Sequence, residues 1–199
     1  MRVLIACEYS GIVREAFKKK GHYAMSCDLL PTEIAGDHYQ GDVFDIINDN
    51  WDMMIAHPPC TFLSKAGARW MFQPAGILNI ERYTKAIKGK DFFMKLLNAP
   101  IEKICIENPM PLKVIQLPIQ SQIIQPYQYG NPFSKKTYLW LKNLELLEPT
   151  NILTDYKPFL PSNTGGAKRG QKFQYKSITQ KESAKTFQGI ADAMASQWS

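Results

Sequence analysis

Two residues in the sequence have side chains suited to covalent chemistry, the thiol of Cys60 and the carboxyl group of Glu107. Cys60 closes the segment HPPC at 57–60, and Glu107 opens the segment ENP at 107–109. A thiolate is a nucleophile that adds to electrophilic carbon, and a nearby carboxyl group can stabilise the negative charge that this addition creates. The two residues predict nucleophilic catalysis if their segments meet in space. Spacing alone leaves an alternative open, a loop cysteine and an unrelated glutamate.

The other cysteines do not predict a metal site. Cys7, Cys27 and Cys105 each lie in or at the end of an apolar run, where a buried thiol behaves as a small hydrophobic group. The sequence has no Cys-x-x-Cys pair and no zinc-type grouping of cysteine with histidine. We therefore expect no metal. Cys60 differs because it follows two prolines and precedes a Thr, which predicts a loop position just after a strand.

The segments that must position Cys60 and Glu107 are apolar runs that predict strands buried in a parallel sheet. Residues 51–56 lead into the first site segment and residues 103–106 into the second. Three earlier runs predict further strands, at 2–7, at 23–27 and just before 41–43. Parallel α/β sheets bind ligands outside the carboxyl ends of their strands. Every candidate residue follows such an end.

Helix and turn signals complete an α/β pattern. A turn at Ser10-Gly11 leads into a helix that ends in KKKG at 18–21, which is the opening of a nucleotide-binding βαβ unit. Residues 80–97 predict either one crossover helix or two helices divided at Gly89, and 122–125 with 137–141 predict an antiparallel edge hairpin.

The last part of the chain predicts a loop followed by one more helix. Residues 150–176 lack periodicity and carry prolines, glycines and basic residues, which indicates an exposed basic loop. A capping box at 179–182 then predicts a final helix, one face of which carries Ala184, Phe187, Ala191, Met194 and Trp198. We expect a single domain over 1–199.

The motifs resemble those of a known family. PPCTFLS at 58–64 is similar to the Pro-Cys-Gln-x-x-Ser nucleophile motif of the DNA cytosine C5-methyltransferases, and ENP at 107–109 resembles that family's Glu-Asn-Val. ACEYSG at 6–11 and TFQGIADAMA at 186–195 are typical of its compact single-domain members in bacteriophages and mobile elements. The resemblance covers nearly all of the chain. It implies a Rossmann-like S-adenosylmethionine-dependent methyltransferase fold, mostly a parallel sheet with an antiparallel edge hairpin.

The resemblance implies methylation of C5 of cytosine in DNA. Because C5 is a poor nucleophile, the Cys60 thiolate would first add to C6 while Glu107 holds N3 and the exocyclic amine. The target base must leave the stack to reach Cys60.

The family pattern also implies a binding site for S-adenosyl-L-methionine. Asp28 would hold the ribose hydroxyls, and a carboxylate at the end of the second strand is suited to that role, although such an aspartate can also cap a turn or helix. Asp42 and Val43 would meet the adenine, although a Gly-Asp pair can also be an ordinary turn. The remaining cofactor residues would be Glu8, Tyr9, Ser10, Gly11 and Pro58.

Three features depart from the family pattern. Lys135 and Lys136 stand where the family has arginines that contact cytosine O2, and a lysine lacks the bidentate fork of arginine, so the sequence leaves open which lysine acts. The first loop has one glycine, Gly11. The target recognition domain shrinks to 150–176, which leaves little protein to read DNA sequence. Its expected nucleic-acid contacts are Lys168, Arg169, Lys172 and Lys176, with Ser64 beside the nucleophile.

Composition is compatible with this interpretation. Lys and Arg number 24 against 18 Asp and Glu, a net charge of +6 that favours a polyanionic partner such as DNA. The start of the chain lacks a secretory signal, and no run approaches the length of a membrane span, so we expect a cytoplasmic protein. Two alternatives stay open, the same chemistry on RNA or a free deoxycytidine nucleotide, and a catalytically idle nucleic-acid-binding relative.

Overall fold

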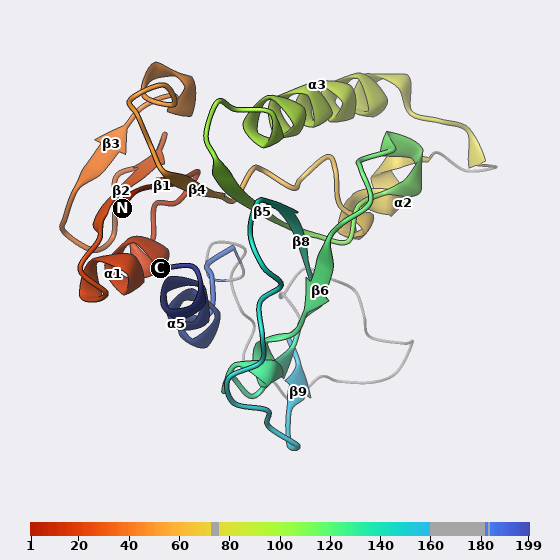
Figure 1. The fold of residues 1–199 in the computed structure, drawn as a ribbon. Helices are drawn as coiled ribbons and strands as arrows, with labels where there is room; N and C mark the ends of the chain where they lie inside the picture. The colour runs from red at the N-terminus through yellow and green to blue at the C-terminus, as the bar shows by residue number, and fades with distance from the viewer. Residues whose placement is uncertain (73–75, 160–181, 183) are drawn as a thin grey trace.

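A seven-stranded sheet in the order β3-β2-β1-β4-β5-β8-β6 forms the centre of the molecule (Figure 1). The computed structural model describes residues 1–72, 76–159, 182 and 184–199. The strands of this sheet are β1 (Arg2–Ala6), β2 (Tyr23–Asp28), β3 (His38–Gln40), β4 (Met53–Ala56), β5 (Lys103–Pro109), β6 (Gln122–Ile124) and β8 (Thr137–Lys142). A second sheet pairs β7 (Phe133–Ser134) with β9 (Lys157–Pro158) in parallel.

The helices of the described residues connect and cover these strands. The α-helices are α1 (Ile12–Lys19), α2 (Ala68–Met71), α3 (Ile80–Leu97) and α5 (Gln188–Gln197). Short 3-10 turns are η1 (Val43–Asp45), η2 (Lys65–Gly67), η4 (Lys113–Ile115) and η5 (Pro126–Gln128).

The strand order reverses beside β1, which has β2 on one side and β4 on the other, all parallel. A reversal of this kind opens a crevice at the carboxyl ends of the two central strands, and ligands of doubly wound sheets bind there. Residues that follow β1 and β4 are therefore placed at this crevice.

The antiparallel part of the sheet agrees with the predicted hairpin. Strand β8 runs antiparallel to β5 and to β6, with Cys105 opposite Leu141 and Ile123 opposite Tyr138. The hairpin partner β6 forms the edge, and β8 lies between it and β5. The expected fold class, α/β and Rossmann-like with a mostly parallel sheet and an antiparallel edge hairpin, is confirmed.

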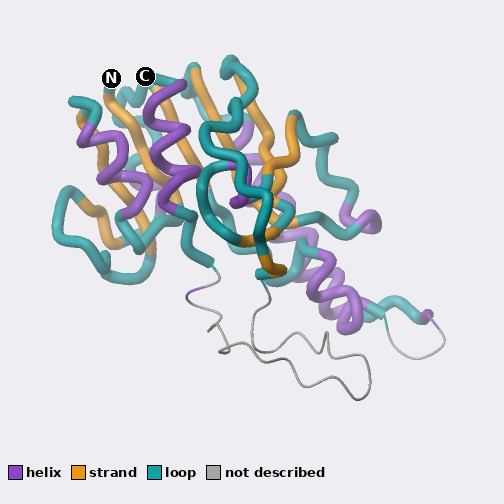
Figure 2. Tube along the Cα trace, turned by 90° about the horizontal axis from the view of Figure 1, so that it is seen from below, coloured by secondary structure: helices purple, strands orange, loops and turns teal. Residues whose placement is uncertain are grey.

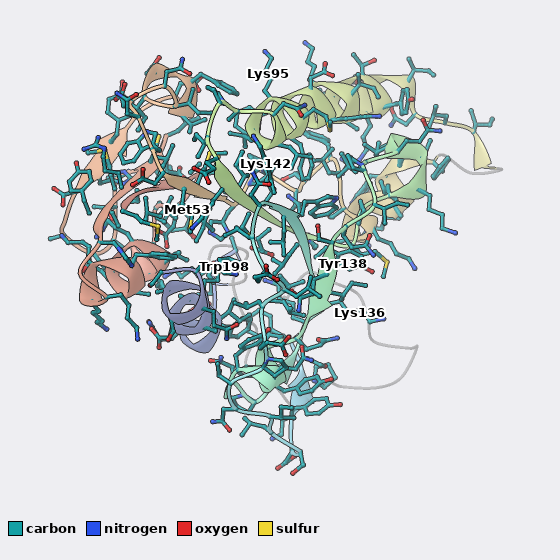
Figure 3. All side chains as sticks on the ribbon, viewed as in Figure 1. Met53, Lys95, Lys136, Tyr138, Lys142 and Trp198 are labelled. Atoms are coloured by element: carbon teal, nitrogen blue, oxygen red, sulfur yellow. The ribbon has the colours of Figure 1, made fainter. Side chains whose placement is uncertain are left out.

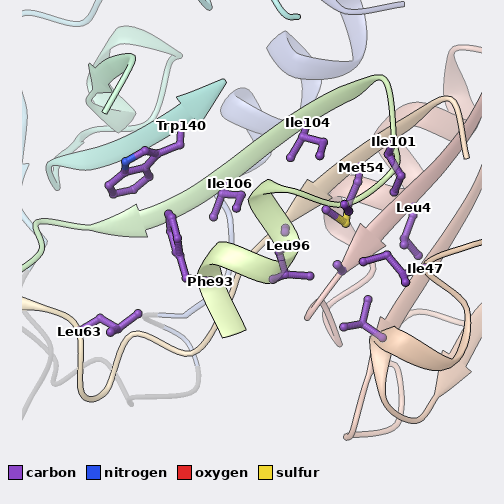
Figure 4. Close-up of a cluster of buried hydrophobic side chains, with 14 of the residues drawn as sticks. Leu4, Ile47, Met54, Leu63, Phe93, Leu96, Ile101, Ile104, Ile106 and Trp140 are labelled. Atoms are coloured by element: carbon purple, nitrogen blue, oxygen red, sulfur yellow. The ribbon is translucent and has the colours of Figure 1, made fainter. Parts of the chain in front are cut away.

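Helices pack on both faces of the sheet and form a hydrophobic core on each. Side chains of β1 point alternately to the two faces and therefore contribute to both cores. Val3 and Ile5 face the layer of α1 and α5, whereas Leu4 faces the layer of α3. Helices α1 and α5 lie side by side, with the two termini close together (Figure 2). On the other face, Phe93 and Leu96 of α3 pack with residues of β1, β4, β5 and β8 (Figure 4).

One predicted strand end is wrong, and one open alternative is decided. Glu107 lies inside β5 rather than after it, because β8 extends the pairing as far as Pro109. Of the two alternatives for residues 80–97, the structure has the single helix: α3 runs unbroken through Gly89, where a Cβ atom would lie 3.3 Å from Cδ2 of Leu63. The cost of a single glycine in a helix, about 1 kcal/mol, is small against the packing of the rest of α3.

The last helix also starts later than expected, at Gln188, so Ala184 and Phe187 precede it. Phe187 takes an extended conformation and packs its ring on Phe159 and Phe133, which belong to the second sheet or adjoin it. Residues 179–181 of the expected capping box lie outside the described residues, as do Lys168, Arg169, Lys172 and Lys176 of the basic loop.

Candidate active site

The segment after β4 forms a tight turn that ends the strand and carries Cys60. The His57 amide donates to the carbonyl of Ala6 at 2.9 Å, which fixes the start of this segment beside β1. The Cys60 carbonyl accepts hydrogen bonds from the amides of Leu63 and Ser64, at 3.0 and 2.9 Å. These hydrogen bonds fix the backbone of Cys60 just after β4.

Glu107 meets this segment because β4 and β5 are neighbours, with Ala56 opposite Ile106. The Nδ1 atom of His57 lies 3.1 Å from Oε2 of Glu107. The side-chain Nδ2 of Asn108 donates to the carbonyl of Pro58 at 2.9 Å. The structure therefore brings the two predicted catalytic segments together.

The surroundings of Cys60 act on its thiol in opposite directions. Burial raises the pKa of Cys60, and the negative charge of Glu107 raises it further. The charge of Lys135 and a hydrogen bond from Ser64 work against this rise, and the pKa of the thiol remains above its ordinary value. The thiolate, which is the nucleophilic form, is thus favoured by higher pH.

The neighbours of Glu107 favour its charged form. Burial pushes the pKa of Glu107 upward, but the His57 hydrogen bond and the charges of His57 and Lys135 outweigh burial and lower it. A carboxylate with this environment accepts hydrogen bonds readily.

Of the two candidate lysines, the structure brings Lys135 to Cys60 and Glu107. Its ammonium lies 5.6 Å from the ring centre of Phe159 and 5.8 Å from that of Phe187, so two aromatic faces support it. Its charge acts on both Cys60 and Glu107. Lys136 is exposed just before β8 and has no comparable effect on either residue (Figure 3).

A pocket of about 250 Å³ lies next to the nucleophile turn. Three of the predicted cofactor residues line it, Asp28, Asp42 and Val43. Pro59 lines it from the turn, whereas the carbonyl of Pro58 is turned toward Asn108. The remaining lining residues are Cys7, Cys27, Leu29, Gly41, Phe62, Gly89 and Phe92. The pocket is thus mainly apolar with two carboxylates.

Each pocket carboxylate has one oxygen engaged by a local turn. Oδ1 of Asp28 accepts from the Leu30 amide at 2.9 Å, and Oδ1 of Asp42 accepts from the Phe44 amide at 3.0 Å. Both predicted turn roles are present. Within the described part of the chain, Oδ2 of each aspartate makes no hydrogen bond, so each is available to a ligand hydroxyl or amine.

The first loop holds the start of α1 and does not line the described pocket. Oε1 of Glu8 accepts from the Val13 amide at 2.8 Å and from the Ser10 hydroxyl at 3.0 Å. A carboxylate is favourable at a helix N-terminus, where the helix dipole is positive. The cofactor roles of Glu8, Tyr9, Ser10 and Gly11 therefore remain predictions. Because the side chains of Glu8 and Ser10 are engaged in these hydrogen bonds, their contacts with a cofactor would be made by backbone atoms.

A buried arginine, which sequence reasoning missed, anchors the loop that follows Asp28. The Arg14 guanidinium donates to the hydroxyls of Ser26 and Thr32, at 2.9 and 3.2 Å, and to the carbonyl of Ile34. Gly11, at a φ of 77°, makes room for it, since a Cβ there would lie 2.8 Å from the guanidinium.

Ser64 is buried beside Cys60. Its contact with nucleic acid remains a prediction.

His57, Asn108, Phe62 and Phe92 were also missed. His57 and Asn108 lie inside the two candidate catalytic segments, and their adjacency to Cys60 and Glu107 was the available signal. Phe62 and Phe92 gave no signal, because apolar residues of a turn and a helix look like core residues in a sequence.

The part of the chain that the structure describes holds no group of three or more His, Cys, Asp or Glu side chains placed to bind a metal ion. Among the same residues, no helix is both long and apolar enough to cross a membrane.

Comparison with known proteins gives distant structural likenesses. No protein-family model matches the chain, and no curated protein sequence matches it. One similar structure is described as a DNA modification methyltransferase encoded within a prophage of E. coli, with 17% identity, a TM-score of 0.46, and coverage of 77% of this chain and 52% of that one. Another is a mutant of DNMT2 from Spodoptera frugiperda, with 17% identity, a TM-score of 0.40, and coverage of 82% and 56%. The chain spans little more than half the length of either protein.

Proposed function

We propose that the protein is an S-adenosylmethionine-dependent methyltransferase that acts on C5 of cytosine in DNA. The observation that carries this proposal is the contact between the Cys60 segment after β4 and the Glu107 segment of the neighbouring strand β5, made by His57 with Glu107 and by Asn108 with Pro58. This contact lies beside a pocket that Pro59 and Phe62 line. In this proposal, one crevice contains the nucleophile Cys60, the Glu107 carboxylate that binds the edge of the cytosine ring, and the pocket for the cofactor.

The proposed reaction starts from a cytosine that has left the base stack. The Cys60 thiolate forms a bond to C6, the electrons of the C5=C6 bond move toward N3, and N3 takes up a proton at Glu107. C5 then gains the methyl group, loses its own proton to a base, and the C5=C6 bond re-forms as the C6–S bond breaks. The net products are 5-methylcytosine, the demethylated cofactor and one proton, and the thiolate is regenerated.

The pocket suits the proposed cofactor. Phe62 and Phe92 offer apolar surface for a purine, and Oδ2 of Asp28 can accept from ribose hydroxyls. Pro59 places one end of the pocket next to the nucleophile. When bound, S-adenosylmethionine supplies an electrophilic methyl group.

DNA as the partner is supported by the charge of the segment that follows the nucleophile. Residues 65–90 contain six basic residues and one acidic residue, Glu81, a net charge of +5 within a chain of +6. Trp70 is 56% exposed there, and the Arg69 guanidinium lies 4.5 Å from its ring centre. Exposed cations contact phosphates, and exposed aromatic rings stack on unpaired bases.

The test of this function is methyl transfer from labelled cofactor to four substrates, namely duplex DNA, single-stranded DNA, RNA and free deoxycytidine nucleotides. We expect label in DNA, at cytosine C5. Label in RNA or nucleotides alone would support those alternatives. DNA binding without transfer to any of the four would support the idle relative.

Lys135 and Lys136 form a matched pair for testing the role of the cation. Lys135→Ala removes a charge that lowers the pKa of Cys60, so the acid side of the pH–rate profile should move to higher pH. We also expect a rate loss of about 10-fold or more at neutral pH, the usual scale for an electrostatic contact to a developing charge. The profile comes from single-turnover methyl transfer at a series of pH values.

Lys136→Ala is the control, because it removes the same charge from the next position along the chain. We expect its pH profile and rate to match those of the wild type. A shift in Lys136→Ala without one in Lys135→Ala would reverse the assignment.

A further inference from the structure

The imidazole of His57 lies in the candidate active site, and the reaction proposed above gives it no role. Its backbone is fixed by the hydrogen bond to Ala6, and Nδ1 lies 3.1 Å from Oε2 of Glu107. Its side chain is 9% exposed. Among the described residues, Nε2 is buried and has no hydrogen-bond partner. The ring is therefore held through one nitrogen only, the one that faces Glu107.

The proposed chemistry needs a proton at this place. When the thiolate adds to C6, N3 becomes basic and must be protonated. Glu107 faces N3 in the proposed complex, but His57 and Lys135 favour its ionised form, which carries no proton to give. Imidazole side chains exchange protons between about pH 5 and 8, and His57 is the neighbour in hydrogen-bond contact with Glu107.

We propose that His57 and Glu107 act as one unit holding a single transferable proton, which His57 supplies and Glu107 delivers to N3 of the target cytosine. This inference rests on the proposed function. As the Cys60–C6 bond forms, the Nδ1 proton of His57 passes to the Glu107 carboxylate, and the carboxyl group, by turning about its Cγ–Cδ bond, gives that same proton to N3. Glu107 is then ionised again and His57 is neutral. When the thiolate leaves, N3 returns its proton to Glu107 and the pair recovers its starting charge. His57 acts through Glu107 and is a positioning and proton-supplying residue.

The titratable groups around the pair come from three elements. Cys60 lies on the turn after β4, Lys135 precedes β8, and Cys105 lies on β5 beside Glu107. The thiol of Cys60 must lose a proton to attack, which makes the rate rise with pH on the acid side. The pair must keep its proton, which makes the rate fall with pH on the alkaline side. The wild type should therefore show a bell-shaped profile.

His57→Asn separates proton supply from positioning, because an asparagine amide can donate to Oε2 of Glu107 but carries no transferable proton. We expect the single-turnover rate near pH 7.5 to fall by about 100-fold, the scale of general acid catalysis. The falling limb should move to lower pH, since the proton must then come from Glu107 alone. His57→Ala should lose at least as much, and His22→Asn, far from the site, should match the wild type.

A second measurement does not depend on turnover. In the wild type with labelled histidine, the ring resonances of His57 should titrate together with Glu107, and in Glu107→Gln their midpoint should move to lower pH. The resonances of His22 and His38 should be unchanged in the same variant. An unchanged His57 titration would overturn the proton-sharing unit even if the His57 variants failed to fold.

The outcomes for the inference and for the function are distinct. A wild type that transfers no methyl group to cytosine would sink the proposed function. A wild type that does so, with a His57→Asn variant of unchanged rate and pH profile, would sink the role of His57 alone.

Discussion

Cys60→Ser should abolish methyl transfer while leaving the fold and cofactor binding nearly unchanged. The substitution replaces one sulfur atom with oxygen, and a serine hydroxyl is a far weaker nucleophile than a thiolate at neutral pH. The backbone turn should persist, because the hydrogen bonds of Leu63 and Ser64 go to the carbonyl of residue 60 and not to its side chain. Single-turnover transfer, with thermal unfolding and cofactor titration alongside, measures the three properties separately.

A duplex with 5-fluorocytosine at the target should trap the wild-type protein covalently, because fluorine at C5 cannot leave as a proton does. Peptide mapping should find the adduct on Cys60. Cys7→Ser is the matched control, since Cys7 is the other cysteine that is not fully buried, and it should still form the adduct. Substantial activity in Cys60→Ser, or an adduct on Cys7, Cys27 or Cys105, would place the chemistry elsewhere.

Glu107→Gln should lower turnover by about 100-fold or more, because it removes the group that stabilises charge at the ring edge. The same change removes a negative charge that raises the pKa of Cys60. The thiolate should therefore be more abundant in the variant, and alkylation of Cys60 by iodoacetamide at a fixed pH should become faster. Slower methyl transfer with faster alkylation would show that the lost activity is not a lost nucleophile.

The control for this pair of measurements is Glu102→Gln, an exposed glutamate just before β5. It should change neither rate. If Glu107→Gln slowed transfer and lowered thermal stability in step, without a change in alkylation, Glu107 would be a structural residue and the proposed chemistry would lose its acid.

The sequence alone predicted the elements of the sheet and the two candidate catalytic segments. Strands buried on both faces of a sheet are short, continuous apolar runs in the sequence. This is why β1, β4 and β5 could be predicted, together with the candidate residues near their carboxyl ends. The pairing of Cys60 with Glu107 followed from the tendency of successive strands in βαβ units to be neighbours. The later helix start at Gln188 was not predictable. Phe187 is extended and packs on Phe133 and Phe159, which are distant from it in the sequence.

Only the tertiary structure decided which groups act on Cys60 and Glu107. Lys135 and Lys136 are equivalent in sequence, and only Lys135 rests on the aromatic faces of Phe159 and Phe187. The contact of His57 with Glu107 spans 50 residues and exists because β4 and β5 lie in register. Residue type and local periodicity specify strands and candidate side chains. Distances between side chains depend on strand order and packing, and those are set by contacts among residues far apart in the chain.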